Sequence, residues 1–186
     1  KSFDYLERDA DYKAFKLSKE IDRVEPYLIP LSASGEERVN RIVDENCVIS
    51  IHEHPCVYPE DVTETFDYCR QGRQATAFEA LSKSCLDCVF DNLMDGFCMI
   101  TSKSGWKWND VLHDLGIRLS DIEHQDFVIV AKRVDDILRA HREGKVALVM
   151  ALEGAMPIEN ELDRIDILYG FGLRLMGLVY SESNAL

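Results

Sequence analysis

The apolar residues of this chain gather in short, continuous runs and do not alternate with polar residues. Runs of this kind, rich in Val, Leu, Ile and Met, are typical of parallel strands that are buried on both faces. The stretches between them have helix-compatible patterns, so strands and helices alternate along the chain. The sequence therefore predicts an α/β fold with a parallel sheet and right-handed crossovers. The predicted strands are residues 48–52, 86–93, 146–152 and 173–180.

Helices are predicted before and between these strands. The helix that ends at Gly144 has clear signals at both ends, because acidic residues stand in its first turn and basic residues in its last. A proline-containing stretch at 26–30 separates two helices that precede the first strand. We therefore expect an N-terminal helical lead-in over residues 1–45 and the β/α unit over residues 46–186. The predicted helices are residues 9–22, 36–44, 76–83, 110–131, 134–142 and 159–169.

Composition narrows the class of protein. The 186 residues are 46% apolar, which suits one substantial core. The net charge of −13 argues against binding to a nucleic acid backbone, which needs clustered Lys and Arg. No apolar run approaches the roughly 20 residues that span a bilayer, and the first residues lack the pattern of a secretory signal. We therefore expect a globular protein with no nucleic acid partner, no membrane span and a cytoplasmic location.

Cysteine spacing raises a separate possibility. The chain has six cysteines, and Cys85 and Cys88 have the spacing of a redox or zinc motif. No second cysteine pair or histidine pair follows at the spacing of a zinc ribbon, and Cys88 opens an apolar strand. Buried free thiols are therefore favoured over disulfides or a structural zinc site, which fits a reducing compartment.

The candidate chemistry lies at the ends of two predicted strands. His52 and His54 end the first strand, and side chains two residues apart on a strand point to the same face. Glu153 directly follows the third strand, and the carboxyl ends of parallel strands meet at one edge of the sheet. Imidazole and carboxylate suit zinc and similar ions, so the sequence predicts a metal site there. An ordinary histidine pair and a glutamate that caps the next helix are the alternatives.

Characteristic motifs in the second half of the chain include Ala140-His141-Arg142-Glu143-Gly144-Lys145, Leu152-Glu153-Gly154 and Gly172-Leu173-Arg174. Together with the His52 strand, these motifs resemble the membrane dipeptidase family of metallopeptidases over roughly residues 45–186. The resemblance implies a TIM (β/α)₈ barrel of the metal-dependent hydrolase type, amidohydrolase-like, of which residues 46–186 would form the N-terminal portion. It also implies a dipeptidase with two zinc ions that cleaves its substrate through a metal-bridged hydroxide. His52 matches the histidine ligand of the family's first strand, and Glu153 matches the carboxylate that bridges the ions.

Two residues depart from the family pattern. His54 stands where the family has an aspartate ligand, and this changes the charge of the site by one unit. Tyr180 stands where the family has a histidine that contacts the substrate; a phenol can still donate to an oxyanion, so Tyr180 is kept as a catalytic and substrate-binding candidate. Asn184 is a further substrate-binding candidate. Other residues near strand ends could line the pocket or act as loop caps and turn residues: Asp91, Asn92, Ser181 and Glu182.

The length of the chain also matters, because a closed barrel takes about 250 residues and only four strands are predicted. The resemblance therefore implies that two histidine ligands and an arginine for the substrate carboxylate lie further along a longer polypeptide. Family members also suggest a homodimer.

Two other functions remain open. One is a metal-dependent hydrolase of another amide or a cyclic amide, favoured by His54 and Tyr180. The other is a metal-free, barrel-derived interaction protein. The loop at 105–109 carries two tryptophans and could be a substrate lid or a packed covering loop.

Overall fold

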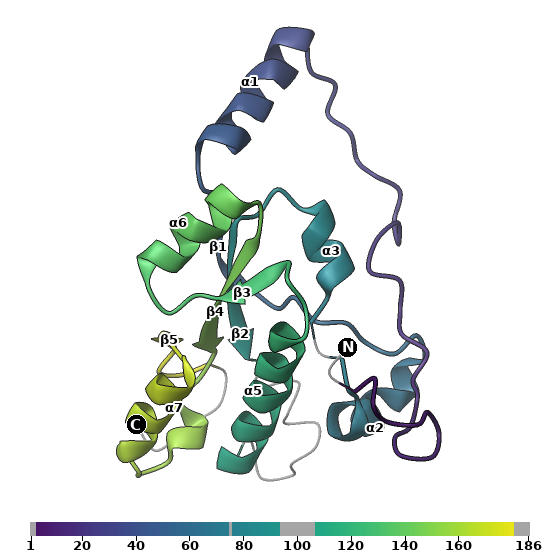
Figure 1. Ribbon diagram of the computed structural model, residues 1–186, viewed down its shortest axis with the longest axis vertical. Helices are drawn as coiled ribbons and strands as arrows, with labels where there is room; N and C mark the ends of the chain where they lie inside the picture. The colour runs from purple at the N-terminus through teal and green to yellow at the C-terminus, as the bar shows by residue number, and fades with distance from the viewer. Residues whose placement is uncertain (1–2, 75, 94–106, 181–186) are drawn as a thin grey trace.

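A computed structural model describes residues 3–74, 76–93 and 107–180 (Figure 1). Its centre is a parallel sheet of five strands with the order β1-β2-β4-β3, in which β5 also pairs with β4. The strands are β1 (Ile49–Glu53), β2 (Cys88–Leu93), β3 (Val128–Val130), β4 (Val146–Leu152) and β5 (Leu175–Met176).

Six α-helices and two 3-10 helices connect and flank the described strands. The helix α1 lies beyond one end of the sheet, and none of its residues is buried (Figure 1). The α-helices are α1 (Ala33–Glu45), α2 (Thr65–Gln71), α3 (Phe78–Lys83), α5 (Trp108–Glu123), α6 (Val134–Glu143) and α7 (Asp163–Phe171); the 3-10 helices are η1 (Val62–Glu64) and η2 (Met156–Ile158).

The strand β4 is the centre of the sheet. Along one edge it pairs with β2 over six residues, from Cys88 with Ala147 to Leu93 with Leu152. Its other edge is shared, because β3 pairs with the first residues of β4 and β5 pairs with the last two. The strands β1, β2, β4 and β5 therefore run side by side and parallel, and their carboxyl ends reach the same edge of the sheet.

Both faces of β4 are covered, which explains its continuous apolar sequence. All seven of its residues are buried. Leu148 and Met150 belong to a large apolar cluster with Leu115 of α5, whereas Val149 points into a second cluster with Ala140 of α6. A strand that is buried on both faces cannot alternate apolar and polar residues, so the prediction of a parallel sheet is confirmed.

The prediction of one helix over residues 110–131 was wrong. The helix α5 ends at Glu123, and β3 begins at Val128. Gln125 makes the turn: its Oε1 accepts hydrogen bonds from the backbone N–H groups of Phe127 and Val128, and its Nε2 donates to two backbone carbonyls. A side chain that satisfies this many backbone groups competes with the helix, and the β-branched run that follows then pairs with β4.

Three other predicted elements differ from the structure. Residues 9–22 form turns, bends and isolated bridges, and two of them, Asp9 and Asp22, have positive φ. The predicted helix at 159–169 begins only at Asp163, because η2 and the positive φ of Glu159 precede it. Of the predicted strand at 173–180, only Leu175–Met176 is β-structure.

The structure tests the predictions for the cysteines and the tryptophans only in part. No disulfide joins the cysteines in the described part of the chain; Cys88 is buried as predicted, whereas Cys85 is exposed. Trp108 begins α5 and packs against the core, with the guanidinium of Arg164 5.1 Å from its ring centre. The other tryptophan, Trp106, lies outside the described residues. None of the described helices is long and apolar enough to cross a membrane.

Candidate metal centre

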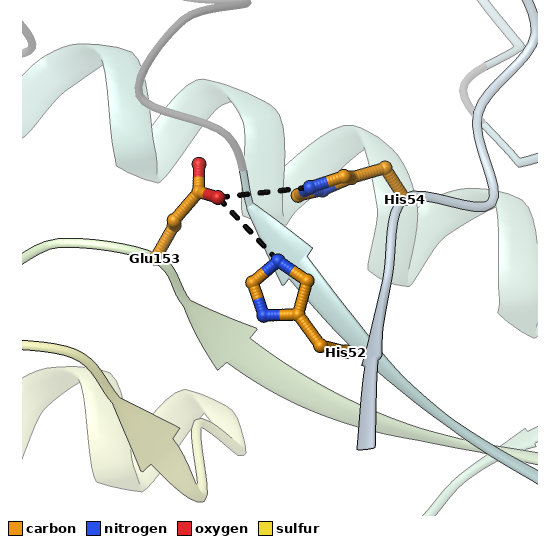
Figure 2. A group of neighbouring side chains, drawn as sticks. All are labelled: His52, His54 and Glu153. Carbon is orange, nitrogen blue, oxygen red and sulfur yellow. Dashed lines mark ion pairs between the residues drawn. The ribbon is translucent and has the colours of Figure 1, made fainter. Parts of the chain in front are cut away.

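Two strands bring His52, His54 and Glu153 together. His52 lies within β1, His54 follows the end of β1, and Glu153 follows the end of β4. The Nε2 atom of His52 lies 3.4 Å from Oε1 of Glu153, and Nε2 of His54 lies 3.7 Å from the same oxygen. Figure 2 shows both imidazole rings turned toward this carboxylate, with their ring centres 5.1 Å apart. The structure therefore places the three predicted ligands in one cluster, although their role as ligands stays a prediction.

The three side chains differ in burial. Only 9% of the Glu153 side chain is exposed, compared with 28% for His54 and 55% for His52. The backbone N–H of Glu153 donates to the carbonyl of Leu93, which joins the end of β4 to the end of β2. The backbone of Glu153 is thus fixed within the sheet and its side chain is largely buried, while the cluster stays open to solvent on the side of His52.

The tautomer of His54 follows from its second nitrogen. Its Nδ1 lies 2.7 Å from the carbonyl oxygen of Asn92. A carbonyl oxygen can only accept a hydrogen bond, so Nδ1 carries the hydrogen. In the neutral ring, the lone pair then lies on Nε2, the nitrogen that faces Glu153. A second bond of this kind is the usual way in which a ligand histidine is oriented.

The spacing of the cluster suits a single zinc ion. Two ligand atoms about 2.1 Å from a tetrahedral ion lie about 3.4 Å apart, close to the separations between each Nε2 and Oε1. The three ligand atoms all lie within 4.8 Å of one another, and no other group of three or more potential ligands lies so close among the residues that the structure describes. Both imidazoles approach the same oxygen of this carboxylate, Oε1. The donor set therefore fits zinc.

Tyr180 lies near this cluster through its backbone. A Cβ placed on Gly154 would lie 3.7 Å from the Cβ of Tyr180, so Tyr180 is a neighbour of the residue that follows Glu153. Its side chain is exposed, and its part in substrate binding stays a prediction. Asn184, the other predicted substrate contact, lies outside the described residues.

Asp91 and Asn92, which could line the pocket or act as loop caps, are both buried. Asp91 instead pairs with Arg118 of α5, a partner that sequence reasoning missed. A charged residue inside the apolar run of β2 was the available signal, but nothing in the sequence names a partner 27 residues away.

The family model of membrane dipeptidases, peptidase family M19, matches residues 36–186. This chain belongs to the membrane dipeptidase family. Two solved structures are similar in fold: an amidohydrolase from Pseudomonas aeruginosa, with a TM-score of 0.53 and 14% identity, and the probable dipeptidase PvdM from the same organism, with a TM-score of 0.50 and 19% identity. No curated protein matched the chain.

The similarity covers most of this chain but less than half of each solved structure. It takes in 78% of this chain and 37% of the amidohydrolase, and 82% of this chain and 40% of the probable dipeptidase. The chain therefore spans about two fifths of the length of these proteins. Its curled parallel sheet matches part of the TIM barrel of these two structures, which confirms the predicted fold class.

Proposed function

We propose that this chain carries the first part of the metal centre of a zinc-dependent dipeptidase, which hydrolyses the peptide bond of its substrate. The observation that carries the proposal is the convergence of His52, His54 and Glu153 at the carboxyl ends of two parallel strands. This is the end of a barrel at which catalytic residues collect. Membership of the membrane dipeptidase family supports the reaction class.

The residues have distinct parts in this proposal. His54 presents Nε2 because Asn92 holds its other nitrogen, and Glu153 presents Oε1 to both histidines. When bound, zinc polarises the scissile carbonyl and makes a water molecule more acidic. Oε2 of Glu153 is proposed to hold a second zinc ion, whose other ligands would lie outside the described residues. Tyr180 and Asn184 are proposed to contact the substrate, and the phenol of Tyr180 is suited to donate to the oxyanion.

A hydrolase of another amide or a cyclic amide is the second candidate. His54 and Tyr180 favour it, because each replaces a residue that the family pattern places at the site. With zinc bound, two imidazoles and one carboxylate leave a net charge of +1, one unit more positive than a site in which an aspartate replaces His54. The candidates differ in what they hydrolyse, so parallel assays of dipeptides, lactams and cyclic imides distinguish them.

Zinc titration of the chain tests the metal site directly. We expect the wild-type chain to bind one zinc ion through the three residues and Glu153→Gln to bind at least about 10-fold more weakly, because an amide is a poor ligand for zinc. Glu53→Gln is the matched control: Glu53 stands between the two histidines, but its carboxylate accepts a hydrogen bond from Ser50. Absence of zinc binding by the wild type, or equal binding by Glu153→Gln, would contradict the proposal and favour a metal-free interaction protein.

The assembly is a separate part of the proposal. A homodimer is the expected state, and light scattering coupled to size-exclusion chromatography tests it. A mass near 21.3 kDa would indicate a monomer.

A further inference from the structure

A buried network of charges lies between β2 and α5, next to the cluster of His52, His54 and Glu153. Nη1 of Arg118 donates to both carboxylate oxygens of Asp91, at 2.9 and 2.7 Å, and its Nε donates to Oδ1 of Asp114 at 3.4 Å. The three residues are only 3%, 0% and 7% exposed, respectively. Oδ2 of Asp114 has no hydrogen-bond partner among the described residues.

Stability alone is a weak reason for such a network. Removing charged groups from water costs several kcal/mol per ion, and apolar residues of similar volume in the same place are often equally stable or more so. Burial raises the pKa of the Asp91 carboxyl, with the neighbouring Arg118 acting in the opposite direction. A network that is expensive to bury and incompletely satisfied suggests a role in fixing a geometry.

The first link from this network to the proposed metal ligands runs along β2. Asp91 is followed by Asn92, and the carbonyl of Asn92 accepts the hydrogen bond from Nδ1 of His54. In the sheet register, Asp91 is also the partner of Glu53, which lies between the two histidines. A shift of the end of β2 would therefore move the acceptor that orients His54.

The second link runs through the segment that follows His54. The backbone N–H of Cys56 donates to the carbonyl of His54 at 2.7 Å, and its thiol lies 3.3 Å from the same oxygen. Cys56, Asp114 and Arg118 line one small cavity, so this segment packs directly beside the charges. His54 is thus attached on both sides to elements that adjoin Arg118.

We propose that Arg118, together with Asp91 and Asp114, is a positioning group for His54. It fixes the end of β2 so that the carbonyl of Asn92 holds His54 with the hydrogen on Nδ1 and with Nε2 toward Glu153. Its relevance to catalysis rests on the proposed metal site. The hydrogen bond of His54 to Asn92 does not depend on the proposed metal site, and it can be measured without any metal.

Two variants test the proposal. The triple variant Asp91→Val, Asp114→Leu, Arg118→Met removes all three charges together, so no buried charge is left without a partner. Arg118→Lys keeps the charge but replaces the two separate donors, Nη1 to Asp91 and Nε to Asp114, with a single ammonium group. If the triple variant does not fold, Arg118→Lys carries the test.

A pair at the opposite end of β2 provides the control. Asp87 precedes β2, and its carboxylate lies 2.9 Å from Nδ1 of His141 and accepts a hydrogen bond from the backbone of Val48. The double variant Asp87→Asn, His141→Asn removes this side-chain contact without touching the end of the strand that carries Asn92. This control variant should lower the urea midpoint while leaving the arrangement of His52, His54 and Glu153 unchanged.

Three readouts separate positioning from a merely structural role: the zinc dissociation constant, the absorption spectrum of the cobalt-substituted chain and the tautomer of His54 from long-range ¹H–¹⁵N NMR. We expect zinc binding about 10–100-fold weaker in the triple variant, a smaller loss in Arg118→Lys, and a mixture of His54 tautomers in both. The control variant should keep the wild-type values.

The result that overturns the inference is a folded variant in which His54 keeps a single tautomer with the hydrogen on Nδ1 and zinc affinity is unchanged. Failure of the proposed function is a distinct result. If the wild-type chain does not bind zinc, the metal site is refuted, but the metal-free NMR comparison still decides whether the Arg118 network holds His54.

Discussion

Gly177 provides a precise test of how the carboxylate of the cluster is held. This residue follows β5, and its backbone N–H donates to the carbonyl of Leu152 at 2.8 Å. A Cβ at this position would lie 2.2 Å from the carbonyl oxygen of Glu153 and 3.1 Å from its carbonyl carbon. Gly177→Ala therefore pushes on the backbone of the residue that links both histidines.

The size of the effect follows from this distance. Ordinary van der Waals contact begins at 3.4 Å, so the backbone of Glu153 or of residue 177 must move by about 1 Å. Overpacking of this kind costs typically about 1–3 kcal/mol. A metal site must be held to within about 0.5 Å, so a displacement of this size should weaken zinc binding by at least about 10-fold, or about 1.4 kcal/mol.

The matched control is Gly170→Ala in α7, where an added Cβ meets nothing within 4 Å. Alanine is better than glycine in a helix by about 0.5–1 kcal/mol, so this variant should be slightly more stable than the wild type with unchanged zinc affinity. Urea unfolding and zinc competition with a chelator measure both quantities. Wild-type zinc affinity and an unchanged urea midpoint in Gly177→Ala would refute the reasoning.

Three further predictions concern the ligands, the backbone and the thiols. His54→Asp should increase the affinity for Mn²⁺ relative to Zn²⁺, because carboxylates suit manganese and imidazoles suit zinc; calorimetric titration with each ion measures the ratio. Gly144→Ala should cost about 1–2 kcal/mol in urea unfolding, because the residue ends α6 with φ at 64°. Burial raises the pKa of the Cys88 thiol from about 9 to about 11. The stability that comes from burying the neutral thiol should therefore be complete below pH 9 and be lost as the pH rises through 11. The urea midpoint of Cys88→Ala should fall less over this pH range than the urea midpoint of the wild type.

The sheet could be predicted where the apolar pattern alone determines the structure. β4 is a continuous apolar run because it is covered on both faces, and the predicted bounds of β2 and β4 lie close to those in the structure. β3 could not be separated from the preceding helix, because the turn depends on four hydrogen bonds made by one side chain, Gln125. Residues 9–22 have a helix-compatible pattern, but Leu17 instead forms a bridge with the distant Pro59.

The cluster could be predicted in part for a similar reason. A parallel sheet brings the carboxyl ends of its strands to one edge, and this alone places the histidines and Glu153 near one another. The orientation of His54 depends on the backbone carbonyl of Asn92, and a carbonyl has no sequence signature. The pairing of Asp91 with Arg118 depends on how α5 packs against β2, which the apolar pattern does not specify.

β2 lies between the two strands that carry the proposed ligands. The histidines come from β1 and the carboxylate from β4, while β2 pairs with both. Neighbouring strands lie about 4.8 Å apart, so β1 and β4 are separated by roughly 9–10 Å, which the histidine and glutamate side chains together must span. Because β2 sets this separation, any shift of its end changes the distance between Nε2 and Oε1. A strand that contributes no ligand side chain thus determines whether an ion fits, and this is the physical reason to expect that a buried network on β2 affects metal affinity more than overall stability.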